Sequence, residues 1–72
     1  MNLYEFLQHH IGTLETVDQC RTMNLCITIR EDELTHTEAA MLRQAVKIRE
    51  DDVILMERFL QYLEIKKSHT NS

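Results

Sequence analysis

The stretch THTEAAMLRQAVKIREDDVILMERFLQYLEIK, residues 35–66, decides the fold of this 72-residue chain. It contains no Gly and no Pro, and its apolar residues recur at helical spacing among strong helix formers. Thr35 and Glu38 match a capping box, so the helix is expected to begin there. We expect the residues before it to pack against this helical core.

The apolar residues of this stretch form a seam with alternating steps of three and four positions. Residues 53–65 are apolar at nine of thirteen positions. A helix that is apolar over most of its circumference is buried on several sides, and the rest of the chain offers too little surface to cover it. The sequence therefore predicts a self-association or partner interface at Leu42, Val46, Val53, Met56, Phe59, Leu60 and Leu63.

The segment REDD at residues 49–52 interrupts the seam. It is either an exposed turn of one continuous helix or a break at which Asp51 or Asp52 caps a second helix. A continuous helix would be about 46 Å long, which is longer than a compact domain of this size uses. We therefore predict a break near residue 50, with a continuous helix protruding into a partner as the alternative.

Two short helices are predicted before this stretch. Residues 2–11 carry apolar side chains three or four positions apart, and Gly12 follows where a helix end favours a residue with positive φ. Thr13 is expected to cap a second helix over residues 13–24, with acidic residues in its first turns. One helix running through Gly12 is the alternative.

Residues 25–30, LCITIR, depart from the helical pattern. Apolar and polar residues alternate there and several are β-branched, which favours a short strand at 26–30. A lone strand has unpaired backbone groups, so it would pair with the same strand of a second copy. An extended linker or a helical turn is the equal alternative.

These patterns together predict a mainly all-α fold. A single helical domain is expected over residues 1–67, followed by a polar tail at 68–72 that frays. We expect the long or broken C-terminal helix pair to form an oligomeric core, because a chain this short buries only about 60% of its unfolded surface. The two cysteines are too few for a disulfide framework, so association is the expected source of extra stability.

Charge and hydropathy argue against several classes of protein. The net charge of −4 opposes broad, charge-driven binding to nucleic acid. No apolar run is long enough to span a membrane, and the N-terminal residues lack the basic region of a signal peptide. The sequence therefore predicts a soluble, cytoplasmic protein with reduced thiols.

No cofactor, metal site or catalytic residue is expected. No Cys or His pair has the spacing of a structural zinc site, and the adjacent His9 and His10 would point about 100° apart on a helix. No residue pattern activates a thiol, and a carboxylate run such as residues 50–52 is usually a solvated turn. One glycine cannot build a phosphate-binding loop, so we predict that the protein is not an enzyme.

The favoured hypothesis is a small regulatory protein that binds another protein through a helical surface. Methionines at positions 23, 41 and 56 and the excess of apolar helical surface suit docking onto partner helices. The acidic charge suits the basic DNA-binding face of a transcriptional repressor. This would make the chain an antirepressor-like inhibitor of the kind that mobile elements encode.

The alternative hypothesis is a DNA-binding transcriptional regulator. A strand at 26–30 followed by two helices makes residues 25–65 similar in outline to the ribbon-helix-helix repressors, whose paired strands enter the major groove. That resemblance implies DNA contacts from Thr28 and Arg30. The chain departs from the pattern in having no glycine at the turn between helices, an acidic composition and only one long basic side chain on the ribbon.

Overall fold

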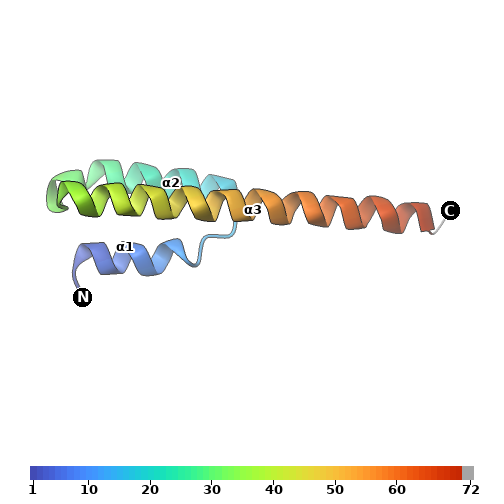
Figure 1. The fold of residues 1–72 in the computed structure, drawn as a ribbon, viewed down its shortest axis with the longest axis horizontal. Helices are drawn as coiled ribbons and strands as arrows, with labels where there is room; N and C mark the ends of the chain where they lie inside the picture. Colours follow the sequence, from blue (N-terminus) through green and yellow to red (C-terminus); the bar gives the residue numbers. More distant parts are fainter. Residues whose placement is uncertain (71–72) are drawn as a thin grey trace.

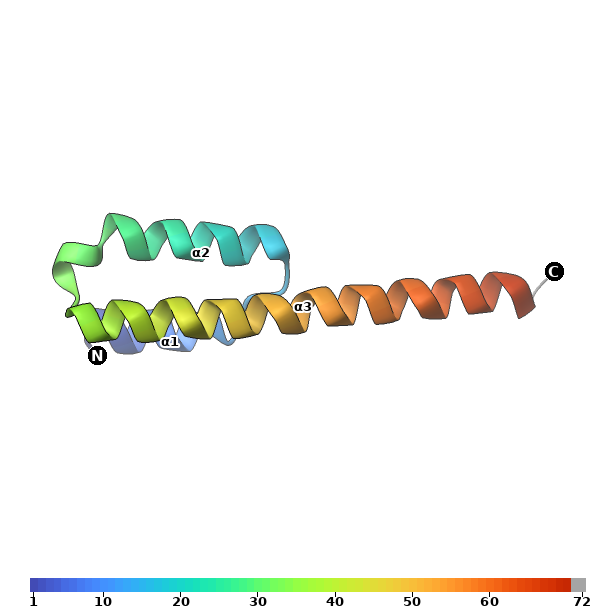
Figure 2. The same ribbon diagram turned by 45° about the horizontal axis from the view of Figure 1, so that its top comes forward.

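The computed structural model describes residues 1–70, and only the backbone of residues 68–70. Within this range the chain forms three α-helices and one short 3-10 helix, with no strand: α1 (Leu3–Ile11), α2 (Val17–Ile29), η1 (Glu31–Glu33) and α3 (His36–Thr70). Helices α1 and α2 lie along the first half of α3, and the second half extends beyond them (Figures 1 and 2). The predicted all-α class is confirmed.

A side-chain cap sets the start of α3. The Thr35 hydroxyl accepts a hydrogen bond from the Glu38 amide at 3.1 Å, and the Glu38 carboxylate accepts one from the Thr35 amide at 2.9 Å. Each side chain thus satisfies one of the amides that the first helical turn leaves without a backbone partner. The predicted capping box is confirmed.

The second helix begins later than the sequence predicts. Thr16, not Thr13, is its N-cap, and the Thr16 hydroxyl accepts a hydrogen bond from the Gln19 amide at 3.1 Å. Thr13 instead donates its hydroxyl proton to the His10 carbonyl at 2.7 Å, which satisfies an acceptor at the end of α1. Helices α1 and α2 are therefore separate, and the single helix through this region is also wrong.

Gly12 does not adopt the conformation that the sequence predicts. Its φ of −65° and ψ of −15° are right-handed helical values, so the expectation of a positive φ is wrong. Thr13 and Leu14 donate their amides to the carbonyls of His10 and Ile11, so the turn closes with helix-like bonds and needs no left-handed residue.

Substituting Gly12→Ala should therefore raise the free energy of unfolding by about 0.4–1 kcal/mol. The added Cβ would meet no atom closer than the His9 carbonyl oxygen at 3.5 Å, an ordinary contact, while the unfolded chain would lose conformational freedom. Urea unfolding followed by circular dichroism measures the change. A loss of stability would show that this turn needs a glycine.

The strand predicted at 26–30 is wrong, because α2 continues through Ile29. In the helix, Ile27 is fully buried while Leu25 and Ile29 point to solvent. A strand would have placed these three side chains on one face. The β-branched residues are helical here because α3 offers Ile27 a buried site, and burial outweighs the small strand propensity of the segment.

The two isoleucines of this segment provide a matched pair. Ile27→Ala should lower the free energy of unfolding by about 2–5 kcal/mol, because it empties a fully buried site. Ile29→Ala removes the same atoms from a side chain that is 68% exposed. It should change the free energy of unfolding by less than about 0.5 kcal/mol. Equal effects in urea unfolding would contradict the helical assignment.

Helix α3 runs without a break through residues 49–52, so the predicted break near residue 50 is wrong. Among these four residues, Arg49 faces the neighbouring elements, and its Nε donates a part-buried hydrogen bond of 2.8 Å to the Leu14 carbonyl. Asp51 and Asp52 are exposed. The charged residue in the seam therefore has a partner inside the fold, and the helix can continue past it.

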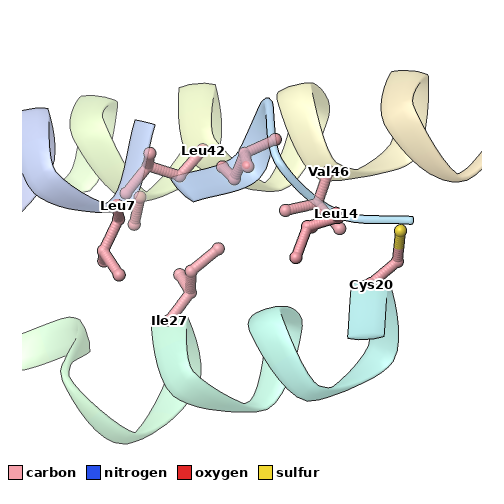
Figure 3. Close-up of a cluster of buried hydrophobic side chains, with 8 residues drawn as sticks. Leu7, Leu14, Cys20, Ile27, Leu42 and Val46 are labelled. Atoms are coloured by element: carbon pink, nitrogen blue, oxygen red, sulfur yellow. The ribbon is translucent and has the colours of Figure 1, made fainter. Parts of the chain in front are cut away.

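A small hydrophobic core joins the three helices. We call residues 3–53, which contain this core, the head. Side chains from α1, the α1–α2 connection and α2 meet the first half of α3 (Figure 3) at Leu7, Ile11, Leu14, Cys20, Ile27, Ala39, Leu42 and Val46. Val53 is the last buried residue along α3.

The molecule is much longer than it is wide, measuring 56 by 19 by 15 Å. Its Cα radius of gyration is 16.2 Å, against about 11 Å for a compact chain of this length. Its accessible surface is 5744 Å², against roughly 4,700 Å² for a compact monomer of this mass. The excess comes from the part of α3 that no other element covers. The polar tail expected at 68–72 overlaps the end of α3, and residues 71–72 lie outside the described part.

Candidate functional site

The exposed second half of α3 is the candidate functional site, and we call residues 54–67 the arm. Large apolar side chains project from it into solvent, with exposed fractions from 43% at Leu63 to 67% at Leu55. The set comprises Leu55, Met56, Phe59, Leu60, Tyr62, Leu63 and Ile65. So large a contiguous apolar surface on a small protein marks an interaction site.

The structure divides the predicted interface residues into two groups. Leu42, Val46 and Val53 are buried within the head, where they contribute to the fold of the single chain. The other four lie exposed on the arm: Met56, Phe59, Leu60 and Leu63. The first group contacts the chain's own helices, so only the second group is available to another molecule.

The arm carries a shallow apolar hollow close to its centre. Leu55, Met56, Phe59 and Leu60 line it, and its volume is about 380 Å³. No charged side chain contributes to its lining. A hollow of this kind accommodates an apolar side chain from a facing surface.

One side of the arm continues the side of α3 that lies next to α1. In the head, Tyr4 and Gln8 of α1 share a groove with Met41 and Ile48 of α3. Residues seven positions apart stay on one side of a helix, with a drift of only about 20°. The row that begins in this groove is apolar throughout, and its side chains are between 51% and 67% exposed: Met41, Ile48, Leu55 and Tyr62.

The side of the arm that continues the α2 side is polar. In the head, the Arg43 guanidinium donates to the Thr28 hydroxyl and to the Glu31 carboxylate, both at 3.3 Å. The same row continues along α3 as Glu50, Glu57 and Glu64. The arm therefore has an apolar side in line with α1 and an acidic side in line with α2.

Thr28 and Arg30, the residues named for DNA contact, lie at the end of α2. The Thr28 hydroxyl donates to the Asn24 carbonyl at 3.1 Å and accepts from Arg43, while the Arg30 side chain pairs with Glu33 at 3.6 Å. Three acidic residues follow in η1. Residues 1–70 contain no strand pair that would carry these side chains into a groove of DNA.

The two cysteines differ in their exposure to solvent. Cys20 is buried in the head, and burial raises the pKa of its thiol, with the Glu50 carboxylate acting in the same direction and Arg49 opposing it. Cys26 is exposed on α2. In the described part of the chain, no three His, Cys, Asp or Glu side chains are placed to hold a metal ion.

We expect a thiol reagent to modify Cys26 and spare Cys20 in the native protein. The Cys20 side chain is inaccessible and its thiol stays protonated, whereas Cys26 is open to solvent. Iodoacetamide treatment at neutral pH followed by peptide mass spectrometry measures this, with a urea-unfolded sample as the control in which both react. Equal native reactivity would contradict the packing of α2 on α3.

Although α3 has 35 residues, charged side chains recur along it, and no helix within residues 1–70 is apolar enough over sufficient length to cross a bilayer. In comparisons with known proteins, no family model, no curated protein and no solved structure matched the chain.

Sequence reasoning missed the second apolar row of α3. The seam that runs through Leu42 and Val46 was identified, but the row Met41, Ile48, Leu55 and Tyr62 was not. Its signal was an unbroken seven-residue spacing of large apolar side chains. Only the placement of α1 and α2 shows which of the two rows remains exposed.

Proposed function

We propose that this protein is a non-catalytic regulator that acts by binding protein, and that the arm is its binding element. The observation that carries the proposal is the run of large apolar side chains that α3 exposes beyond Val53. Leaving them in water is unfavourable by roughly 25 cal/mol for each Å² of apolar surface, so a partner that covers them gains that free energy. A binding role accounts for this feature.

The shape of the arm favours a helical partner surface. The arm is about 21 Å long at 1.5 Å per residue, and its large apolar side chains recur along its length outside the acidic row of Glu57 and Glu64. This is the pattern by which an amphipathic helix docks against a groove or another helix. Met56, near the start of the arm, adds a flexible side chain that adapts to the facing surface.

The acidic charge of the chain favours a regulatory target with a basic surface. The net charge is −4, and η1 places Glu31, Asp32 and Glu33 together at the end of the head far from the arm. A transcriptional repressor presents a basic DNA-binding face, and complementary charge speeds and orients such an association. Inhibition of a repressor is therefore the regulatory role that we propose.

The test is capture of protein by an immobilised full-length chain from nuclease-treated lysate of source cells. We expect the immobilised wild-type chain to retain a protein from the lysate, which is either a free copy of this chain or another protein. We expect the immobilised Phe59→Glu chain not to retain that protein. That substitution places a charge in the centre of the apolar surface. Mass spectrometry of the eluates measures the loss.

The matched control is Gln61→Glu, two positions away on the same arm. Gln61 is exposed and lies between Glu57 and Glu64 on the polar side, so the added charge stays in solvent. It should retain the captured protein at the wild-type level. If no captured protein distinguishes Phe59→Glu from the control, the arm is not the binding element.

A further inference from the structure

We propose that the arm binds the arm of a second copy of this chain, with the two helices antiparallel and the dyad between Phe59 and Leu60. This inference rests on the proposed binding role of the arm and names its partner. In this arrangement Phe59 lies opposite Leu60 of the partner subunit. Met56 lies opposite Leu63 of the partner subunit.

The facing residues lie on one side of the helix. At 100° per residue, six positions fall within about 100° of one another around the axis of α3. They comprise Asp52, Met56, Phe59, Leu60, Leu63 and Lys67, all of which are exposed. Apolar residues occupy the centre of this surface, an acidic residue lies at its start and a basic residue at its end.

Charge selects the antiparallel orientation. With the dyad between Phe59 and Leu60, Asp52 lies opposite Lys67 of the partner subunit, and symmetry repeats this pair at the other end. A parallel pair would place Asp52 beside its own copy and Lys67 beside its own copy, so that like charges meet. The antiparallel pair also aligns the two helix dipoles favourably.

The position of the heads agrees with the same orientation. The head covers α3 only as far as Val53, and the arm extends from it alone (Figures 1 and 2). In an antiparallel pair the two heads lie at opposite ends and do not compete for space. In a parallel pair both heads would lie at the same end of the paired helices.

The proposed pair would cover part of the surface that the arm exposes. The accessible surface of 5744 Å² exceeds that of a compact monomer of this mass by roughly 1,000 Å². A standard interface takes about 800 Å² from each partner.

The first test is the mass of the purified full-length chain, measured by sedimentation over roughly a hundredfold range of concentration. We expect twice the 8.6 kDa of one chain, dissociating on dilution. Phe59→Glu should weaken association at least about a hundredfold, since it places charges at the centre of the pair. The control Gln61→Glu should associate like the wild type.

The second test addresses the orientation. Asp52→Lys and Lys67→Asp should each weaken the dimer by about tenfold, because two ion pairs become repulsive, and the double substitution should restore it. Both positions are exposed, so neither change disturbs the head. A parallel pair would show no such rescue.

The third test is a disulfide cross-link in a Cys26→Ser background, which removes the exposed native thiol. Chains carrying M56C should cross-link to chains carrying L63C, and neither variant should cross-link to itself. Cross-linking of M56C to itself would overturn the proposal in favour of a parallel pair.

The outcomes separate this inference from the proposed function. The inference is wrong if the chain is monomeric at every concentration. It is also wrong if the chain dimerises and Phe59→Glu leaves the association unchanged. If the same variant nevertheless loses another captured protein, the binding role of the arm stands with a different partner. If Phe59→Glu changes neither self-association nor capture, both proposals fail.

Discussion

The structure depends on a mismatch of length between α3 and the helices that cover it. At 1.5 Å per residue, the 35 residues of α3 extend about 52 Å, whereas the 13 residues of α2 extend about 20 Å and the nine of α1 about 14 Å. The covering helices end close to Val53, and α3 has no Gly or Pro before that point or after it. The arm is the part of α3 that extends beyond the shorter covering helices.

The hydrogen bond from Arg49 to the Leu14 carbonyl joins α3 to the connection between α1 and α2. It places a charged side chain in the seam of α3 without an unsatisfied group, and it holds the connection between α1 and α2 against the helix. Before this point the seam is buried by the chain itself at Leu42 and Val46. Beyond Val53 the large apolar side chains from Leu55 onward are exposed.

The distribution of charge around α3 gives the exposed apolar surface a direction. The Arg43 side chain bonds to the end of α2, and its row continues as glutamates, so the row is polar along the whole helix. The row that begins beside α1 remains apolar along the arm, and it borders the surface around Phe59 and Leu60 that we propose for association. The proposed antiparallel pairing of two arms would place the two heads, with their acidic η1 turns, at opposite ends of a dimer.

The sequence by itself determined the all-α class, the start of α3 and the excess of apolar helical surface. Those features depend on local chemistry: the Thr35–Glu38 cap, the lack of Gly and Pro, and the apolar spacing. The tertiary structure alone decided that residues 26–29 are helical, that α3 continues past Arg49, and that the seam divides at Val53. Each of these depends on a contact between distant residues, since Ile27 needs the face of α3 and Arg49 needs the Leu14 carbonyl. Local propensity differs by less than about 1 kcal/mol between such alternatives, and burial of one large side chain exceeds that.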